Sequence, residues 1–372
     1  MSETSTLAAR LRARIAAEGP LTCRDWMAAA LYDEQAGYYN RPDLARWGRA
    51  GDYRTGPERS PLFAAAFARY FAQLHAQLGA PARWTIIETG AGGGHFAQGV
   101  LNVLRDAHPR VYQATSYVLD EQSADARARA RARLTPFIER VTFQRLSDSS
   151  PAPPNIILPT PGVVFANELL DALPSHRVRA RGGRLRELCV GLDGGGQFAW
   201  VERAPTTPRL AEHFARLGVE LEEGQAAEVN LAVEDWLATA ANALTRGYLV
   251  LVDYGAEAAQ LYDATQRPEG TLRAFRRHQL SADALAQPGE QDLTTTVNWT
   301  QMRQVAEGLG LRTVAYARQD EFLLRAGLLE ELERLTAQFT SEAERVALRV
   351  SARDLVLPGG MGESFQVLVL EK

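Results

Sequence analysis

The segment Trp84–Phe96, WTIIETGAGGGHF, decides the fold of this chain. An apolar run of strand length, Trp84–Glu88, is followed by a glycine-rich loop and then by a helical pattern over Phe96–Ala107. Glycines let the backbone turn sharply and approach a ligand closely, and the N-terminus of the helix that follows favours an anionic group. This strand, loop and helix therefore predict a ligand-binding site at one edge of a sheet.

The same alternation of strand and helix continues along the chain. Continuous apolar runs indicate strands that are buried in a parallel sheet, and helical patterns lie between them. The predicted strands are Trp84–Glu88, Ser116–Leu119, Val141–Gln144, Val163–Ala166, Gly247–Tyr254, Leu311–Ala317 and Phe365–Leu370, and the predicted helices include Phe96–Ala107, Ala124–Leu134, Glu234–Arg246 and Met302–Leu309. We therefore expect an α/β protein with a doubly wound, mixed sheet of seven strands.

The predicted domains are residues 1–80 and residues 81–372. The first is a helical region with helices at Leu7–Ala17, Arg24–Tyr32 and Pro61–Leu78. Its irregular loop, Gly37–Glu58, is rich in Gly, Tyr, Asp and Arg, and we expect it to cover the active site. The second is the sheet domain, with insertions at about 176–230 and 256–298. The first insertion has the period-two pattern of an antiparallel meander, and the second is irregular.

Composition narrows the function classes. The apolar fraction of 46% is typical of a soluble globular protein, and a net charge of −4 does not favour nucleic acid. The basic run Arg127–Arg131 is interpreted as a solvated helix face. Cys23 and Cys189 lack metal-ligand spacing, and no apolar run approaches the roughly 20 residues of a membrane span. We therefore expect no nucleic-acid partner, no metal and no membrane insertion.

The residues around the glycine loop favour one ligand class. A dinucleotide-binding loop carries its third glycine where this chain has His95. Glu88 directly precedes the loop, where it would repel a pyrophosphate but could accept a hydrogen bond from the ammonium group of S-adenosylmethionine. We therefore predict S-adenosylmethionine as the cofactor, contacted by Glu88 and by Gly90, Ala91, Gly92 and Gly94. A nicotinamide-binding fold and a purely structural glycine turn remain the alternatives.

Polar side chains end three further strands. Glu121, or in its place Asp120, is predicted to bind the ribose hydroxyls, although an acidic strand end is also typical of a solvated terminus. Asn167, Glu168 and Asp171 follow the predicted strand Val163–Ala166 and are expected where the cofactor meets the acceptor, with Asp171 alternatively capping a helix. Asp253 and Tyr254 end the next strand and have a similar ambiguity.

Six segments resemble the signature sequences of the MidA family of methyltransferases, in the same order and from about Tyr32 to Leu370. They are Gly51–Glu58, the glycine loop, Ala166–Pro174, Asp253–Gly255, Pro288–Thr294 and Met361–Glu363. Two departures occur: Gly56 replaces the serine that is usual in the family, and Gly93 replaces a residue that is commonly polar.

The resemblance implies a class I methyltransferase fold and activity on a protein. Because the family's mitochondrial member is a protein-arginine methyltransferase that acts on a subunit of respiratory complex I, an arginine of a protein partner, here too a respiratory one, is the expected acceptor. A guanidinium has a pKa above 12 and is gripped by carboxylates, so Glu168 and Asp171 are the predicted clamps, with Asn167 beside them and with Asp52 and Glu58 on the covering loop.

Other interpretations remain open at this stage. A small-molecule methyltransferase would need a closed aromatic pocket, a non-catalytic assembly factor would bind S-adenosylmethionine without turnover, and an oxidoreductase would bind NAD. A helical stretch at Leu328–Phe339 could form a homodimer interface or simply cover the sheet. Lys372 is the single lysine among 41 Lys and Arg residues, a usage typical of a GC-rich bacterial genome, and we expect a bacterial cytoplasmic protein.

Overall fold

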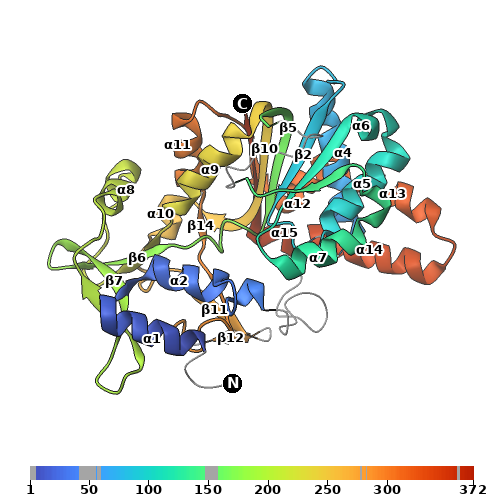
Figure 1. Cartoon of the computed structure of the whole chain (residues 1–372). Helices are drawn as coiled ribbons and strands as arrows, with labels where there is room; N and C mark the ends of the chain where they lie inside the picture. Colours follow the sequence, from blue (N-terminus) through green and yellow to red (C-terminus); the bar gives the residue numbers. More distant parts are fainter. Residues whose placement is uncertain are drawn as a thin grey trace. The chain divides into compact units, whose positions relative to one another are not determined.

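The computed structural model of the chain divides into two compact units (Figure 1). Unit 1 comprises Met1–Tyr53, Leu170–Trp236 and Gly255–Gln304, and unit 2 comprises Arg54–Leu169, Leu237–Tyr254 and Val305–Lys372. The structure describes residues 6–41, 56, 60–146, 158–276, 279–281, 283–357 and 361–372. Within these ranges, no helix combines the length and the apolar character that crossing a bilayer requires. The division of the chain into domains at residue 80 remains a prediction.

Unit 2 is built on a mixed sheet in the order β15-β16-β10-β5-β2-β3-β4. β16 is antiparallel to both of its neighbours, and the pairs from β10 to β4 are parallel. The strands are β2 (Trp84–Thr89), β3 (Thr115–Asp120), β4 (Val141–Phe143), β5 (Thr160–Asn167), β10 (Leu244–Ala256), β15 (Arg312–Arg318) and β16 (Phe365–Glu371). This confirms the expected doubly wound sheet of seven strands. The last residues of β10 also pair with β14 (Val297–Asn298), which adds a short eighth strand.

The strand order of unit 2 reverses at β2. β2 pairs with β3 on one side and with β5 on the other, so consecutive βα units leave it in opposite directions. At such a switch point the loops at the carboxyl ends of the two strands diverge and leave room for a ligand. The glycine loop follows β2 directly and therefore lies at this point.

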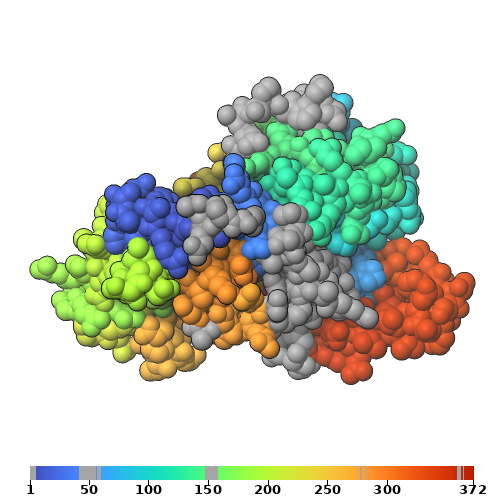
Figure 2. Space-filling model, turned by 60° about the horizontal axis from the view of Figure 1, so that its bottom comes forward, coloured from blue at the N-terminus to red at the C-terminus, as the bar shows by residue number. Residues whose placement is uncertain are grey.

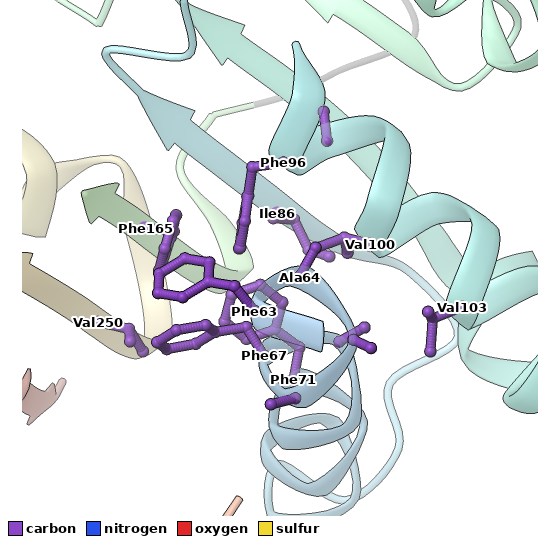
Figure 3. Close-up of a cluster of buried hydrophobic side chains, with 14 of the residues drawn as sticks. Phe63, Ala64, Phe67, Phe71, Ile86, Phe96, Val100, Val103, Phe165 and Val250 are labelled. Atoms are coloured by element: carbon purple, nitrogen blue, oxygen red, sulfur yellow. The ribbon is translucent and has the colours of Figure 1, made fainter. Parts of the chain in front are cut away.

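Helices α4 and α5 pack on the sheet through aromatic side chains (Figure 3). Phe67 of α4 lies 5.1 Å from Phe165 of β5 between ring centroids, and Phe96 of α5 stacks on Phe165 at 4.1 Å with an interplanar angle of 8°. All three rings are buried, and each contributes about 1.5–3 kcal/mol through burial. The helices of unit 2 are α4 (Pro61–Gln77), α5 (His95–Ala107), α6 (Pro109–Ala114), α7 (Ala124–Arg133), η3 (Thr135–Phe137), α12 (Gln319–Arg325), α13 (Leu328–Gln338), α14 (Glu342–Val356) and α15 (Met361–Ser364).

Helix α13 packs against α4 within unit 2 and buries Leu328, in keeping with a covering role. The C-terminal part of the chain, red in Figure 2, forms one continuous region of surface. Leu329 of α13 is 53% exposed, and Val346 and Val350 of α14 are also exposed.

The predicted helix Glu234–Arg246 extends too far. Helix α9 (Ala232–Asn242) ends at Asn242, and β10 begins at Leu244. The alanine-rich sequence favours a continued helix, but the pairing of β10 with β5 and the burial of Leu244 outweigh this local preference. The ammonium group of Lys372 donates hydrogen bonds of 2.8 Å to the carbonyl oxygens of Ala241 and Leu244, which stabilises the early end of the helix.

Unit 1 contains the predicted meander as an antiparallel sheet in the order β1-β7-β6-β9, with β8 paired to β7. Helix α1 buries Leu7, Leu11 and Ile15, so its apolar stripe docks on a core as the sequence predicts. These and further elements of unit 1 are α1 (Leu7–Glu18), β1 (Leu21–Thr22), α2 (Cys23–Tyr32), η2 (Tyr38–Asn40), β6 (His176–Arg181), β7 (Arg184–Leu192), β8 (Phe198–Arg203), α8 (Arg209–Leu217), β9 (Ala226–Val229) and α10 (Ala258–Leu261). Helix α11 (Trp299–Gly308) begins in unit 1, which ends at Gln304, and continues into unit 2.

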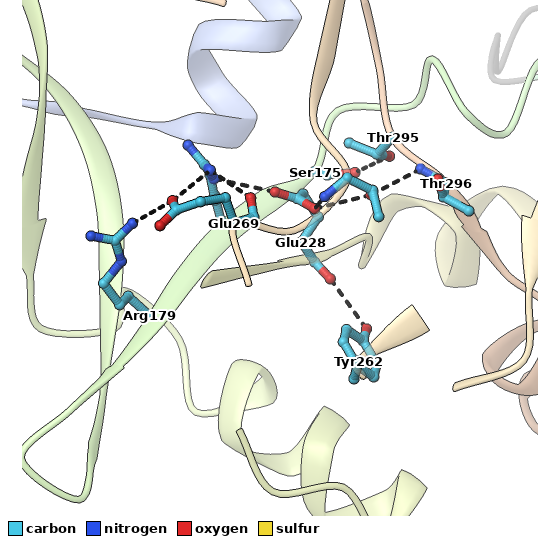
Figure 4. Close-up of polar contacts among 9 residues, drawn as sticks. Ser175, Arg179, Glu228, Tyr262, Glu269, Thr295 and Thr296 are labelled. Carbon is cyan, nitrogen blue, oxygen red and sulfur yellow. Dashed lines mark hydrogen bonds and ion pairs between the residues drawn. The ribbon is translucent and has the colours of Figure 1, made fainter. Parts of the chain in front are cut away.

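The second insertion is more regular than the sequence suggests. It contains a three-stranded antiparallel sheet, β12-β11-β13, formed by Gln279–Ser281, Arg273–Arg276 and Asp292–Thr294. The expectation of an irregular segment is therefore wrong, because strands this short give little period-two signal. Next to this sheet, Oε2 of the buried Glu228 accepts hydrogen bonds from both the amide and the hydroxyl of Thr271, and its Oε1 forms an ion pair of 3.2 Å with Nε of Arg177, so the buried carboxylate is compensated inside unit 1. Figure 4 shows Glu228 among the polar contacts of this region.

Candidate functional site

The glycine loop of unit 2 has a backbone that only glycine adopts without strain. Gly90, Gly92 and Gly94 have φ angles of 69°, 53° and 75°. A Cβ at Gly90 would lie 3.0 Å from Cδ1 of Leu169, and one at Gly94 would lie 3.1 Å from Cβ of Ala130. The predicted cofactor residues of this loop therefore form a tight turn with little side-chain bulk, in which Gly90 is exposed, as close approach of a ligand requires.

The end of β3 is hydrogen-bonded to this loop. The amide of Gly90 donates to the carbonyl oxygen of Asp120 at 2.8 Å, and the amide of Gly92 donates to Oε2 of Glu121 at 2.7 Å. Oε1 of Glu121 accepts from the amide of Ser123, also at 2.7 Å. Burial raises the pKa of Glu121 above its ordinary value, and these amides oppose the rise. Asp120 thus contributes its main chain to these contacts with the loop and Glu121 contributes its carboxylate, and the preference for Glu121 as the ribose ligand stays a prediction.

Glu88 is buried at the end of β2, with 5% of its surface exposed. The hydroxyl of Tyr117 on β3 donates a hydrogen bond of 2.7 Å to its Oε2. Burial raises the pKa of Glu88 to about 8, although the Tyr117 hydrogen bond lowers it. A ligand cation next to this carboxylate would favour its charged form, so the site suits an ammonium group. Tyr117 was missed at the sequence level, since only the register of β2 and β3 brings it close to Glu88.

The end of β5 holds Glu168 in a fixed and unusual conformation. Its φ of 53° is rare for a residue with a side chain and costs about 1–3 kcal/mol. Its amide donates to the carbonyl oxygen of Val252 at 2.9 Å, and its Oε1 accepts from Nδ2 of Asn167 at 3.0 Å and from the amide of Gly56 at 3.4 Å. Backbone strain that is fixed by several hydrogen bonds is characteristic of functional sites.

The segment after β5 also lies against the glycine loop, because Thr89 pairs with Ala166 and Leu169 faces Gly90. Unit 2 therefore brings together the predicted residues of the glycine loop, the end of β3, and Asn167 and Glu168. These groups come from three adjacent strands of one sheet edge.

The remaining candidates are not among the groups that these three strands bring together. Asp171 belongs to unit 1, where it is buried and its carbonyl oxygen accepts from the amide of Thr295 at 2.9 Å. It lies in a turn, so the alternative of a helix cap is wrong. Asp253 is fully buried in β10, and its Oδ1 accepts from the amide of Tyr254. Asp52 and Glu58 lie outside the described residues.

Two arginines near the site were not predicted to belong to it. Nε of Arg133 on α7 donates to the carbonyl oxygen of Gly93 at 2.8 Å, and Arg127 donates to the carbonyl oxygen of Glu121 at 2.8 Å. The interpretation of this basic run as a solvated face is correct for Arg129, which is exposed, but wrong for Arg127. Sequence periodicity does not distinguish these arginines, because all of them lie at alternate positions of one helix.

This set of groups fits a nucleoside that carries a positive charge. The loop brings main chain without bulky side chains to this sheet edge, Glu121 supplies a carboxylate at the strand end where a ribose is expected, and Glu88 supplies a buried acceptor for an ammonium group. In the described residues, no group of three or more His, Cys, Asp or Glu side chains is arranged to hold a metal ion. Strand β16 lies next to the edge strand β15 and is antiparallel to both of its neighbours. This strand order, together with the site, defines a class I methyltransferase.

Comparison with known proteins agrees with this class. A family model described as "Putative S-adenosyl-L-methionine-dependent methyltransferase" matches residues 66–317. The chain belongs to this family, and the resemblance to the MidA family is thereby confirmed. It is an S-adenosylmethionine-dependent methyltransferase, and the prediction of this cofactor is confirmed.

Individual relatives are similar over nearly the whole chain. A protein from Burkholderia thailandensis, whose crystal structure holds S-adenosyl-homocysteine, is 30% identical with a TM-score of 0.85, over 98% of this chain and 92% of that one. The "Protein arginine methyltransferase NDUFAF7 homolog, mitochondrial" of Drosophila melanogaster is 29% identical over 98% of this chain and 84% of its own length. The human protein arginine methyltransferase NDUFAF7 is 24% identical over 96% of this chain and 81% of its own length.

Proposed function

We propose that this methyltransferase transfers a methyl group to an arginine of a protein partner. Its animal relatives are named protein arginine methyltransferases, and they match almost the full chain. The observation that carries the proposal is the carboxylate of Glu168, fixed at the carboxyl end of β5 beside the glycine loop. A fixed carboxylate is the group that a guanidinium requires, because its pKa above 12 keeps it charged until transfer.

The cofactor residues of the proposal are those of the glycine loop and of two strand ends. The nucleoside and methionine parts of S-adenosylmethionine are surrounded by the main chain of Gly90, Ala91, Gly92, Gly94 and Asp120 and by the carboxylate of Glu121. Glu88 accepts from the ammonium group, and Asn167 orients Glu168 through the hydrogen bond from its Nδ2. Each of these assignments uses a group that the fold presents at one sheet edge.

In the proposed mechanism, the protein mainly supplies alignment. S-adenosylmethionine supplies a methyl group that is bound to a sulfonium. The leaving group is the neutral thioether S-adenosylhomocysteine. The carboxylate of Glu168 holds the acceptor guanidinium so that one nitrogen faces the methyl carbon, at the 3–3.5 Å separation typical of reactive complexes. The same carboxylate accepts the proton that this nitrogen loses as the N–C bond forms and the S–C bond breaks. Asp171, Asp52 and Glu58 are further proposed contacts of the acceptor.

The acceptor protein follows from the family resemblance. Because the mitochondrial member of the MidA family acts on a complex I subunit, we propose a respiratory-chain subunit as the partner of this chain. The planar guanidinium donates two parallel hydrogen bonds to one carboxylate, which gives selectivity for arginine over lysine.

Proteome-wide mass spectrometry tests this function. Cells that contain the protein are compared with cells that lack it and with cells that carry Glu168→Gln or Glu139→Gln, an exposed control in the same unit. We expect a methylarginine that disappears without the protein, is restored by Glu139→Gln, and falls about a hundredfold with Glu168→Gln. Loss of a methylated small molecule instead would contradict the arginine acceptor, and S-adenosylhomocysteine binding without any lost methyl group would favour a non-catalytic assembly factor.

A further inference from the structure

Helix α7 (Ala124–Arg133) packs against both loops of the proposed cofactor site. Its buried face is made of small residues, since Ala126 and Ala130 are fully buried. A Cβ at Gly94 would lie 3.1 Å from Cβ of Ala130 and 3.2 Å from Cδ1 of Leu134. The helix therefore approaches the glycine loop as closely as its side chains allow, and the loop cannot shift toward it.

The C-terminal end of α7 is bonded to the glycine loop. Nε of Arg133 donates to the carbonyl oxygen of Gly93 at 2.8 Å. Gly93 stands between Gly92, whose amide is bonded to Glu121, and Gly94, which is the N-cap of helix α5. A hydrogen bond from a charged donor is roughly twice as strong as a neutral one. Arg133 therefore fixes the Gly93–Gly94 peptide group, which is separated by one peptide group from the amide that contacts Glu121.

The N-terminal end of the same helix is bonded to the other loop. Nη1 of Arg127 donates to the carbonyl oxygens of Glu121 and Gln122, at 2.8 and 2.6 Å. Its charge also lowers the pKa of Glu121, against the larger effect of burial. Arg127 thus fixes the backbone at this strand end and favours the charged form of the Glu121 carboxylate.

The other two arginines of the helix have different partners. Arg129 forms an ion pair with Asp125 one turn earlier, at 2.9 Å, in which the arginine is exposed and the aspartate is half-buried. The guanidinium of Arg131 lies over the ring of Phe143, 4.2 Å from its centroid. Among the described residues, the hydrogen bonds from α7 arginines to the two loops come from Arg127 and Arg133, so Arg129 on the same helix serves as a control.

We propose that Arg133 and Arg127 are positioning residues for cofactor binding, which hold the glycine loop and the Glu121 loop in register from the two ends of α7. The inference rests on the proposed cofactor site and extends it to residues that do not touch the cofactor. Since Gly92 and Glu121 are bonded to each other, a shift of either loop would move the carboxylate away from its ligand. Arg133 therefore acts through Glu121.

Calorimetric titration of the full-length protein with S-adenosylhomocysteine tests this inference. We expect Arg133→Met to weaken binding about tenfold, the loss of one charge-assisted hydrogen bond. Arg133→Lys, which keeps a cationic donor, should recover part of the affinity. Arg129→Met should stay within about twofold of the unchanged protein, because its ion pair is exposed.

A double-variant cycle separates positioning from a general loss of stability. If Arg133 acts through Glu121, the double variant with Glu121→Gln and Arg133→Met should bind S-adenosylhomocysteine about as weakly as the weaker-binding single variant. Two independent effects would instead multiply the two losses of affinity. Thermal unfolding without ligand should be similar for the Met variants at 129 and 133.

The outcomes distinguish this inference from the function on which it rests. If the unchanged protein does not bind S-adenosylhomocysteine, the cofactor site itself is wrong. If it binds, but Arg133→Met and Arg129→Met bind equally well, or if the losses multiply in the double variant, the positioning role is overturned while the methyltransferase function stands.

Discussion

The hydroxyl of Tyr117 donates a hydrogen bond of 2.7 Å to the carboxyl group of Glu88, and both residues are buried. The two side chains come from neighbouring parallel strands of unit 2 and point to the same face of the sheet. Burial raises the pKa of both groups, so the phenol remains a donor throughout the neutral range while Glu88 titrates within it, near pH 8. A titratable acceptor is thus built into the start of the glycine loop.

The first prediction concerns the pH dependence of stability without ligand. The pKa of Glu88 is about 8 in the folded protein, against an ordinary value of 4.5 that applies to the unfolded chain. Between these values the folded state keeps a proton that the unfolded state has lost, so the free energy of unfolding falls as pH rises, by up to about 1.4 kcal/mol per pH unit. Glu88→Gln removes this contribution and should gain stability relative to the unchanged protein between pH 5 and 8.

Urea unfolding at several pH values measures this difference. The exposed Glu139→Gln serves as the control, for which the difference from the unchanged protein should not vary with pH. Equal pH slopes for Glu88→Gln and the control would show that Glu88 is already ionised in the folded protein.

The second prediction concerns cofactor affinity. Tyr117→Phe removes a donor to the carboxylate, so the pKa of Glu88 should rise further and the ionised form that an ammonium group requires should become rarer. We expect the affinity for S-adenosylhomocysteine to fall about fivefold at pH 7, the value of one ordinary hydrogen bond, and to recover as pH increases. Calorimetry at pH 6.5 and 8.5 measures both effects. Tyr112→Phe on α6 is the control, and a pH-independent loss in Tyr117→Phe would indicate damage to packing instead.

The third prediction separates backbone strain from site geometry. Gly90→Ala places a Cβ at a φ of 69° and 3.0 Å from Leu169, whereas Gly79→Ala places one at a φ of 80° with nothing within 4 Å. Both substitutions should cost about 1–2 kcal/mol of stability, because both force alanine into the left-handed region. Only Gly90→Ala should also reduce the binding of S-adenosylhomocysteine, by tenfold or more. Equal affinities of the two variants would place the ligand away from this loop.

Most of the fold follows from local patterns in the sequence. Strands such as β2 and β10 are continuous apolar runs, and the glycines that follow β2 mark the loop at the switch point of the sheet. Where the predicted secondary structure was wrong, the pairing between strands determined which element formed. Leu244 lies in an alanine-rich stretch that favours a helix, but it is paired with Thr160 on β5, a partner 84 residues away that no local pattern reveals.

The candidate site was predicted wherever its residues end or directly follow a strand. Glu88, Glu121 and Glu168 were proposed in this way, because parallel strands bring their carboxyl ends to one sheet edge. Tyr117 and Arg133 were not, because one depends on the register between β2 and β3 and the other on how α7 packs on the glycine loop. These contacts join segments that are 29 and 40 residues apart in the chain.

The last prediction concerns the core that supports the glycine loop. Phe96, the second residue of α5, stacks on Phe165 at 4.1 Å and is 3% exposed. Phe96→Ala should leave a cavity and lower the free energy of unfolding by about 3–5 kcal/mol, whereas Ile138→Ala, at a site that is 47% exposed, should cost far less. Chemical denaturation measures both. Because the cavity would lie directly beneath the loop, Phe96→Ala should also weaken the binding of S-adenosylhomocysteine under conditions where the variant is fully folded. Unchanged affinity under these conditions would show that the loop keeps its conformation without the stacking of Phe96 on Phe165.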